Sequence, residues 1–435
     1  MNWVVKPGGS FQGEITVPGD KSVTQRAYIF SAMAAGTSRV ISPLRSEDTD
    51  NTLAAVRSLG VVIDDRTEEV TISGEGLRSF TEPPDVIDLG NSGTGARLMA
   101  GLLSGCPFLS VLTGDDSLRR RPMARIAEPL RLMGAVIDGR ADGTLLPLTI
   151  RGGELQCIHY CSPVASAQVK SCVLIAALSA EGRTTFTEPA QSRDHTERML
   201  RAMGVEILAE GGTLFIEGGQ VPEAATIQVP GDISSAAFFL VAATVMQGSD
   251  IVVRRVGVNP TRTGILRLLE AMGASILVTP LQGDGEPLAD IRVKGTDALK
   301  GISIPEDWIP SIIDELPLAA VLAAAADGVT ELRGAGELRV KESDRISTTV
   351  QMLSRAGVMV EEFSDGFRIH GPAAICGSSH DSHGDHRIAM SSAILSMLGD
   401  SPSEIRDTAC VATSFPGFLN LMNDLLPGSV SENIQ

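Results

Sequence analysis

The stretch Val17-Pro18-Gly19-Asp20-Lys21-Ser22 returns almost unchanged as Val229-Pro230-Gly231-Asp232-Ile233-Ser234. In each copy Pro-Gly predicts a turn, Asp is a plausible helix N-cap, and a helix-like run follows, over 23–35 and 236–246. Only the first copy contains a cation, Lys21, at a helix N-terminus whose free N–H groups already favour anions. Two crossings of the chain between two domains would explain the repeated motif. We expect the first crossing to contain functional residues and the second to be structural.

Composition limits the classes of protein that this chain can belong to. Its 435 residues are too many for one ordinary core, and 45 glycines with only 4% aromatic residues predict helices and sheets packed through small side chains with many tight turns. The net charge of -17 argues against a general nucleic-acid or membrane-surface binder, whose affinity comes from basic surface. An anionic ligand would therefore need a local basic pocket.

The cysteines and the N-terminal residues predict a cytoplasmic protein. The cysteines are far apart and form no disulfide framework, which favours a reducing compartment. They are Cys106, Cys157, Cys161, Cys172, Cys376 and Cys410. Residues 1–10 show no signal-peptide core, and no uninterrupted apolar run reaches the roughly 18 residues of a membrane span.

A repeated pattern organises the rest of the chain. A helical run of small residues ends near a glycine and leads into a β-rich stretch, at Gly36, Gly105, Gly182, Gly248, Gly328 and Gly399. Between these, a second helix-like run ends in a glycine followed by a strand, at Gly60, Gly134, Gly204, Gly273 and Gly357. Glycine just past a helix is the expected C-cap. Each unit therefore reads as strand, helix, strand, helix and one or two further strands, which predicts an α/β chain of six similar pieces.

The repeated Pro-Gly-Asp motif divides these pieces into two domains of three. We expect residues 19–231 to form one domain, inserted into a second that comprises 1–18 and 232–435, with the first strand before Pro18 belonging to the second domain. An alternative is a repeat scaffold whose units only stack on one another. A pure scaffold has no need for unlike polar residues at equivalent positions, which this chain has.

These polar residues lie where the first helix of each unit is expected to start. They are Lys21-Ser22, Ser92-Gly93, Ala167-Gln168, Ile233-Ser234, Asp314 and His386-Arg387. If the two domains face each other, these helix N-termini converge on an interdomain cleft. Several helix dipoles would then make that cleft positive inside an acidic protein.

The starts of the second helices add further charged groups. They are Asp48-Thr49-Asp50, Arg119-Arg120-Arg121-Pro122, Arg193-Asp194-His195 and Lys341-Glu342-Ser343-Asp344-Arg345. On a helix, Lys341 and Arg345 share a face, as do Ser22 and Arg26. A solvated surface ion pair is the alternative for any one of these motifs, but repetition at equivalent sites favours recognition of phosphate or carboxylate.

Other chemistries find less support. Asn91-Ser92-Gly93-Thr94-Gly95 lacks the Gly-Lys-Ser/Thr ending of a P-loop. The series His380, His383 and His386, and Cys157 with Cys161, could hold a metal, but neither has a completing set of ligands, so we expect no metal. No Gly-x-Ser-x-Gly motif is present, which disfavours a covalent hydrolase.

At these residues the chain resembles the 5-enolpyruvylshikimate-3-phosphate (EPSP) synthase family, from about Pro18 to Pro416. The matching motifs are Pro-Gly-Asp-Lys-Ser at 18–22 with Arg26, Gly-Asn-Ser-Gly-Thr at 90–94, Arg121-Pro122-Met123, Ser166-Ala167-Gln168, Asp314-Glu315, 341–345 and Asp385-His386-Arg387-Ile388-Ala389-Met390. The resemblance implies two similar domains, each of three βαβαββ units, that close over the substrates.

Details of the motifs indicate which class of that family the chain resembles. Ser166-Ala167-Gln168 and Arg193-Asp194-His195 are similar to the family's second class. The nearest rival, the UDP-N-acetylglucosamine enolpyruvyl transferase, shares the fold but usually has a Cys in the loop where Arg119-Arg120-Arg121 stands here. Many EPSP synthases have Lys where this chain has Thr413, so Thr413 is not included among the site residues.

The resemblance implies transfer of the enolpyruvyl group of phosphoenolpyruvate to the 5-hydroxyl of shikimate 3-phosphate, with release of phosphate. It assigns shikimate 3-phosphate to Lys21, Ser22, Arg26, Ser166, Gln168, Arg193 and Lys341, and we count Ala167 and Asp314 among the substrate-binding residues without assigning either to one substrate. It assigns phosphoenolpyruvate to Lys21, Gly93, Arg121, Arg345 and Arg387. We expect a monomer, and the acidic net charge predicts that it binds neither nucleic acid nor membrane.

The reaction needs groups that move protons. Asp314 is the expected base at the 5-hydroxyl. Glu342 is the candidate proton donor, although a carboxyl group among several cations tends to ionise, and Lys21 and Lys341 are catalytic cations beside them. No metal or organic cofactor is needed, because positioning and charge stabilisation can supply the catalysis. A catalytically silent repeat protein that only binds anions is the remaining alternative.

Overall fold

The computed structural model describes residues 1–283 and 285–433, and the chain divides into two compact units. Unit 1 contains Met1–Pro18, Gly231–Gly283 and the chain from Pro287 on. Unit 2 contains Gly19–Pro230, together with Gly285 and Glu286 at the tip of a hairpin. Each unit has its own buried core of apolar side chains, so each is described by itself.

The two copies of the Pro-Gly-Asp motif hydrogen-bond to each other reciprocally. The backbone N–H of Asp20 donates to Pro230 O at 2.7 Å, and that of Asp232 donates to Pro18 O at 2.9 Å. Each Asp also caps a helix, as predicted: the side chain of Asp20 accepts from Val23 N and that of Asp232 from Ser234 N. The helices therefore begin directly after the caps, at Lys21 and Ile233, earlier than the predicted 23 and 236.

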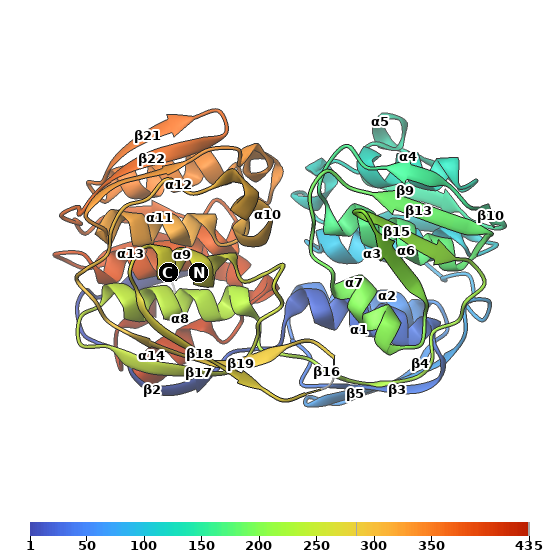
Figure 1. Ribbon diagram of the computed structural model, residues 1–435, viewed down its shortest axis with the longest axis horizontal. Coiled ribbons are helices and arrows are strands. Elements are labelled where there is room, and N and C mark those ends of the chain that lie inside the picture. The colour runs from blue at the N-terminus through green and yellow to red at the C-terminus, as the bar shows by residue number, and fades with distance from the viewer. Residues whose placement is uncertain (284, 434–435) are drawn as a thin grey trace. The chain divides into compact units, whose positions relative to one another are not determined.

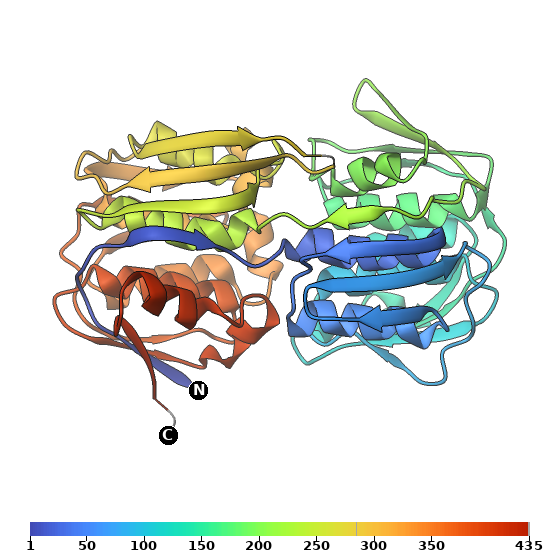
Figure 2. The ribbon, with the colours of Figure 1, turned by 90° about the horizontal axis from the view of Figure 1, so that it is seen from below.

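Three four-stranded sheets in unit 2 have the same strand order, β16-β3-β5-β4, β6-β7-β9-β8 and β11-β13-β15-β14. In each, the first two strands are parallel and the other pairs are antiparallel. Figure 2 shows the first of these sheets face on. The strands are β3 (Ala35–Ile41), β4 (Val62–Asp65), β5 (Glu69–Glu75), β6 (Ile87–Asp88), β7 (Leu109–Thr113), β8 (Val136–Gly139), β9 (Leu148–Arg151), β11 (His159–Cys161), β13 (Arg183–Thr187), β14 (Ile207–Glu210), β15 (Thr213–Glu217) and β16 (Thr226–Gln228), with a small pair of β10 (Leu155–Gln156) and β12 (Ala180–Glu181).

Unit 1 has three sheets, β18-β19-β17-β2, β20-β22-β21 and β23-β24-β1-β25. Strand β2, from before Pro18, pairs parallel with β17, and the first strand of the chain, β1, lies between β24 and β25. N-terminal and C-terminal segments therefore complete the sheets of one unit. The strands are β1 (Asn2–Val5), β2 (Gln12–Thr16), β17 (Asp250–Gly257), β18 (Ser275–Leu281), β19 (Leu288–Lys294), β20 (Gly328–Leu332), β21 (Met359–Phe363), β22 (Gly366–Gly371), β23 (Ser379–Asp381), β24 (Ser403–Arg406) and β25 (Val430–Asn433).

The helices of each unit pack against its sheets (Figure 1). Unit 2 contains α1 (Lys21–Met33), α2 (Glu47–Ser58), α3 (Gly93–Ser104), α4 (Ala124–Leu132), α5 (Arg140–Gly143), α6 (Ala167–Leu178) and α7 (His195–Ala202), with the 3₁₀ turn η1 (Leu118–Arg120). Unit 1 contains α8 (Ile233–Val245), α9 (Gly264–Ala271), α10 (Ile309–Ile312), α11 (Leu316–Ala325), α12 (Arg345–Arg355), α13 (His386–Met397) and α14 (Phe418–Leu425), with η2 (Glu306–Trp308), η3 (Gly336–Val340) and η4 (Thr408–Thr413). The glycines predicted to follow the second helices all have positive φ, for example +106° at Gly134, which confirms them as C-caps.

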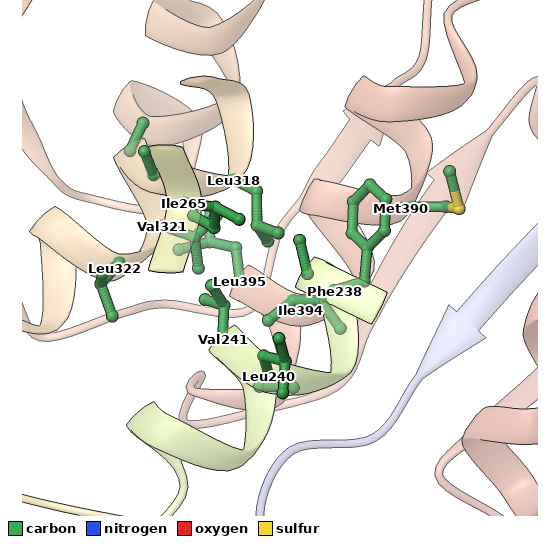
Figure 3. Packing of buried hydrophobic residues seen from close by; sticks show 14 of the residues in the cluster. Phe238, Leu240, Val241, Ile265, Leu318, Val321, Leu322, Met390, Ile394 and Leu395 are labelled. Carbon is green, nitrogen blue, oxygen red and sulfur yellow. The ribbon is translucent and has the colours of Figure 1, made fainter. Parts of the chain in front are cut away.

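Long apolar helices form the centre of each core. In unit 1, side chains of α8, α11 and α13, among them Val241, Val321 and Ile394, point toward one another (Figure 3). In unit 2, α3 and α6 approach closely at Gly101, where an added Cβ would lie 2.5 Å from Cys172 O. This contact confirms the predicted packing through small residues.

No single helix in the described part of the chain is long and apolar enough to cross a membrane. One pair, Glu306–Ile312 and Leu316–Ala325, passes that test by length and composition only and is bent by 116°.

Candidate active site

Lys21 is the first residue of α1, as predicted, and its ammonium group is held by an acidic partner. Its Nζ lies 2.8 Å from Asp48 Oδ2, and Asp48 lies in the first turn of α2. The Lys21 side chain is 20% exposed and the Asp48 side chain 6%. The carboxylate of Asp48 fixes the ammonium group of Lys21 at the N-terminus of α1. The helix dipole favours an anion at the same place.

Arg26 is buried one turn further along α1. Its Nε donates to Thr196 Oγ1 at 2.8 Å, its Nη2 to Ser171 Oγ at 2.9 Å and its Nη1 to Ser22 O at 3.0 Å. The last contact confirms that Ser22 and Arg26 share a face of the helix. The partners of the guanidinium in these bonds are neutral oxygens, so its charge remains available to an anion.

Arg26 lies within electrostatic reach of Arg193, in the loop before α7. Burial lowers the pKa of Arg26 to about 10, the carboxylates of Glu197 and Asp20 oppose that shift, and the positive charge of Arg193 adds to it. A bound anion would relieve both the burial of this charge and the repulsion between the two guanidinium groups. Arg26 and Arg193 therefore lie close enough for their charges to interact.

The N-terminus of α6 presents the predicted Ser166, Ala167 and Gln168. Ser166 caps the helix by accepting from Val169 N. The amide of Gln168 is fixed at both ends, since its Nε2 donates to Thr94 Oγ1 at 2.9 Å and its Oε1 accepts from Arg97 Nη1 at 2.6 Å. This orientation links the start of α6 to the start of α3.

Gly93 and Arg121 are neighbours. Gly93 is the first residue of α3, and a Cβ added there would lie 2.8 Å from Arg97 Nη1 and 3.2 Å from Arg121 Nη1. Arg121 is buried and donates to Asn91 O at 3.2 Å and to Ser117 Oγ at 3.1 Å. Two guanidinium groups thus lie against a helix N-terminus, which is the composition of an anion site.

In unit 1, Arg345 is surrounded by carboxylates. Its Nε lies 2.8 Å from Asp385 Oδ2, its Nη2 2.6 Å from Glu342 Oε2 and its Nη1 3.5 Å from Asp314 Oδ1. Burial acts to lower the pKa of Arg345, but these carboxylates outweigh it and the pKa is raised. Arg345 is therefore a permanent cation within this cluster.

Asp314 is the carboxylate on which three of the predicted cations converge. Besides Arg345, the Nζ of Lys341 lies 3.7 Å and the Nη2 of Arg387 3.9 Å from its carboxylate oxygens. Arg387 Nη1 also donates to Asp314 O at 3.0 Å. The Asp314 side chain is 15% exposed, so it is accessible from one side.

Two local expectations in unit 1 are wrong. Asp314 does not start a helix, because it lies in the turn between α10 and α11 and Glu315 occupies the N-cap of α11. Lys341 and Arg345 do not share a helical face, because α12 begins only at Arg345 after Asp344 caps it. Both cations still reach Asp314 from these positions.

Asp385 allows a prediction about acid stability. It caps α13 and is fully buried against Arg345. Burial acts to raise its pKa, but the charge of Arg345, its hydrogen bond to Asp385 and the charge of His386 together outweigh burial, and the pKa lies below the ordinary 3.8. A group whose pKa is lower in the folded state than in the unfolded state stabilises the fold at pH values above its unfolded-state pKa. That stabilisation is lost as the pH falls through its folded-state pKa. We expect urea titrations between pH 5 and pH 2 to show a smaller loss of unfolding free energy in Asp385→Asn than in the wild type, and equal losses would contradict this assignment.

The predicted site residues are divided between the two units. Unit 2 contains Lys21, Ser22, Arg26, Gly93, Arg121, Ser166, Ala167, Gln168 and Arg193, and unit 1 contains Asp314, Lys341, Glu342, Arg345 and Arg387. Among the described residues, no group of three or more His, Cys, Asp or Glu side chains is placed to hold a metal ion. Thr413 lies at the end of η4, 3.5 Å from His386 Nδ1.

The sequence analysis missed three polar groups beside these residues. Arg97, which holds Gln168, could have been noticed as a lone cation in the apolar run of α3. Asp385 appeared in a motif but was given no role. His195 Nδ1 lies 2.8 Å from Glu286 Oε1, at the tip of the hairpin between β18 and β19, and no local pattern connects residues so far apart in sequence.

An α/β fold with guanidinium and ammonium groups at helix N-termini, and a carboxylate among cations, defines an enzyme class that handles small anionic substrates. The family model for EPSP synthase (3-phosphoshikimate 1-carboxyvinyltransferase) matches residues 5–422. The chain belongs to this family.

Similar proteins agree with that assignment over nearly the whole chain. A 3-phosphoshikimate 1-carboxyvinyltransferase of Citrifermentans bemidjiense is 50% identical over 427 residues, which cover 98% of this chain and 99% of the relative. One of Bacillus velezensis is 49% identical over 418 residues, covering 96% and 97%. A solved EPSP synthase of Acinetobacter baumannii has a TM-score of 0.88 at 46% identity and covers 99% of this chain and 100% of its own.

Proposed function

We propose that this enzyme transfers the enolpyruvyl group of phosphoenolpyruvate to the 5-hydroxyl of shikimate 3-phosphate and releases phosphate, a step of the shikimate pathway. The observation that supports this most is the convergence of Lys341, Arg345 and Arg387 on Asp314. A carboxylate held among cations can accept a proton from an anionic substrate that those cations bind. The family and the relatives' names favour this function over the UDP-N-acetylglucosamine transferase and over a silent anion-binding protein.

The binding residues have distinct roles in this proposal. Shikimate 3-phosphate is held by Lys21, Ser22, Arg26, Ser166, Gln168, Arg193 and Lys341, and phosphoenolpyruvate by Lys21, Gly93, Arg121, Arg345 and Arg387. Ala167 and Asp314 belong to the substrate-binding residues without being assigned to one substrate. Two neighbouring guanidinium groups, of Arg26 and Arg193, suit the 3-phosphate, because a phosphate dianion can accept from both. The residues belong to both units.

The chemistry proceeds by addition and elimination. Asp314 accepts the proton of the 5-hydroxyl while the hydroxyl oxygen forms a bond to C2 of phosphoenolpyruvate. The vinyl carbon C3 gains a proton from a cationic acid, Lys21 or Lys341. The resulting tetrahedral intermediate then loses phosphate from C2 and a proton from C3. The ion pair with Arg345 favours the carboxylate form of Glu342, which suits acceptance of that second proton better than donation of the first.

We further propose an organisation and a setting for this function. Each domain, 19–231 and 1–18 with 232–435, consists of three βαβαββ repeats, a proposal that the common strand order of the three four-stranded sheets in unit 2 supports. The enzyme acts as a cytoplasmic monomer without metal or organic cofactor and binds neither nucleic acid nor membrane. Charge stabilisation by fixed cations supplies the catalysis in place of a cofactor.

A phosphate-release assay tests the proposed reaction. We expect release only when phosphoenolpyruvate and shikimate 3-phosphate are both present, at a turnover of about 1–10³ per second, as for typical enzymes. UDP-N-acetylglucosamine in place of shikimate 3-phosphate should give none. Binding of both substrates without release would instead support the silent anion-binding protein.

A further inference from the structure

A buried set of charges lies beneath the predicted phosphate site of unit 2. Lys170, on α6, is 2% exposed, and its Nζ lies 3.0 Å from Glu188 Oε1 and 2.9 Å from Glu197 Oε1. The two carboxylate side chains are 9% and 4% exposed. None of the three has a role in the proposed reaction.

This set holds the loop that ends at Arg193. Glu188 directly follows β13 and Glu197 lies in the first turn of α7, so the loop between them connects strand and helix. Its residue Ser192 is held at both backbone groups: the N–H donates to Glu188 Oε1 at 2.9 Å, and the carbonyl accepts from Lys170 Nζ at 3.3 Å. The backbone is therefore fixed immediately before Arg193.

The same two helices also hold Arg26. Ser171 follows Lys170 on α6, Thr196 precedes Glu197 on α7, and both accept from the Arg26 guanidinium. Their hydroxyl oxygens are themselves 2.7 Å apart. The two helices that hold the loop before Arg193 therefore also hold the guanidinium group of Arg26.

Fold stability is a poor explanation for such a set. Buried ion pairs are often no better for stability than apolar residues of the same volume, since the cost of desolvating the charges offsets their attraction. The contacts of this set instead hold the backbone of Ser192, next to Arg193. A site that is fixed in advance loses less conformational entropy when its ligand binds.

We propose that Lys170, Glu188 and Glu197 are positioning residues that hold Arg193 beside Arg26 and so preorganise the site for the phosphate of shikimate 3-phosphate. The inference rests on the proposed function, which assigns Arg193 to that phosphate. The three residues act through the loop and do not contact the substrate.

Glu188→Ala is the variant that releases the loop with the smallest disturbance to the buried ion pairs. It removes the acceptor of Ser192 N but leaves Lys170 paired one to one with Glu197. We expect its dissociation constant for shikimate 3-phosphate to rise about 10- to 100-fold, since small misplacements of a binding group cost affinities of this order. The constant for shikimate, which has no phosphate, should stay unchanged.

Three further variants make the measurement specific. Glu188→Gln keeps an oxygen acceptor for Ser192 N and should restore most of the affinity. Glu188→Asp keeps the charge but withdraws the carboxylate, so it should show a smaller loss of the same phosphate-specific kind, and it replaces Glu188→Ala should that variant fail to fold. Glu217→Ala removes an exposed carboxylate of the same unit, paired with Arg183, and should change neither constant.

A double-mutant cycle separates this inference from the proposed function. In an Arg193→Ala background the effect of Glu188→Ala should vanish, because no guanidinium remains to be positioned. Equal losses in both backgrounds, or no phosphate-specific loss in either the Ala or the Asp variant, would overturn the positioning role. Wild-type affinity of Arg193→Ala itself for shikimate 3-phosphate would instead overturn the assignment of Arg193.

Discussion

Replacing Asp314 by Asn should lower the turnover number by about 10²- to 10⁴-fold, the usual contribution of a general base. Asn has the same shape and can still accept hydrogen bonds, but it cannot take the proton of the 5-hydroxyl. The dissociation constant of shikimate 3-phosphate should change little, because Lys21, Arg26 and Arg193 remain in place. An effect on turnover without an effect on binding identifies a group that acts in the transition state.

Steady-state kinetics with a binding titration check this result, and an exposed carboxylate of the same unit provides the control. Asp327 pairs only with Lys300 in the contacts that the described residues show, and both side chains are 66% exposed. Asp327→Asn should keep wild-type turnover. If Asp314→Asn also turns over at the wild-type rate, the base must be another group, and Glu342 becomes the first alternative.

The fold was predictable where local signals and repetition agree. The repeated Pro-Gly-Asp motif predicted two caps, and the structure adds that the two motifs hydrogen-bond to each other across more than 200 residues of sequence. The glycine C-caps and most helix starts followed from local chemistry. The helix through 341–345 was wrong because Asp344, a residue with strong capping preference, delays the helix to Arg345.

The site was predictable only in part, because a sequence shows cations but not their partners. Four cations were identified by their positions at or near predicted helix starts: Lys21, Arg26, Arg121 and Arg345. Their partners are distant in sequence: Asp48 for Lys21, Thr196 for Arg26 and Asp385 for Arg345. Contacts of this kind depend on how helices pack, and neither periodicity nor spacing encodes them. The buried set around Lys170 could not have been inferred for the same reason.

Gly93→Ala tests how closely the backbone at the start of α3 approaches the donor substrate. Gly93 has no side chain, and an added Cβ would lie within 3.2 Å of two guanidinium groups, of Arg97 and Arg121. Contacts this short force those flexible groups to shift and extend a methyl group into the predicted phosphoenolpyruvate site. A ligand longer than phosphoenolpyruvate should clash with it first.

We therefore expect the wild-type enzyme to be sensitive to glyphosate, an anionic analogue that occupies the donor pocket in this family, and Gly93→Ala to be tolerant. The inhibition constant for glyphosate should rise about 10- to 200-fold more than the KM for phosphoenolpyruvate, which is the discrimination that one small group in a pocket provides. The shift of Arg121 is common to both ligands and cancels in that ratio, because specificity is a difference of two affinities. The measurement is the inhibition constant against phosphoenolpyruvate for both forms, with Gly336→Ala as control, since a Cβ there meets no atom within 4 Å. If Gly93→Ala raises the inhibition constant for glyphosate and the KM for phosphoenolpyruvate by the same factor, the methyl group acts only through the guanidinium groups. In that case Gly93 does not approach the donor substrate closely.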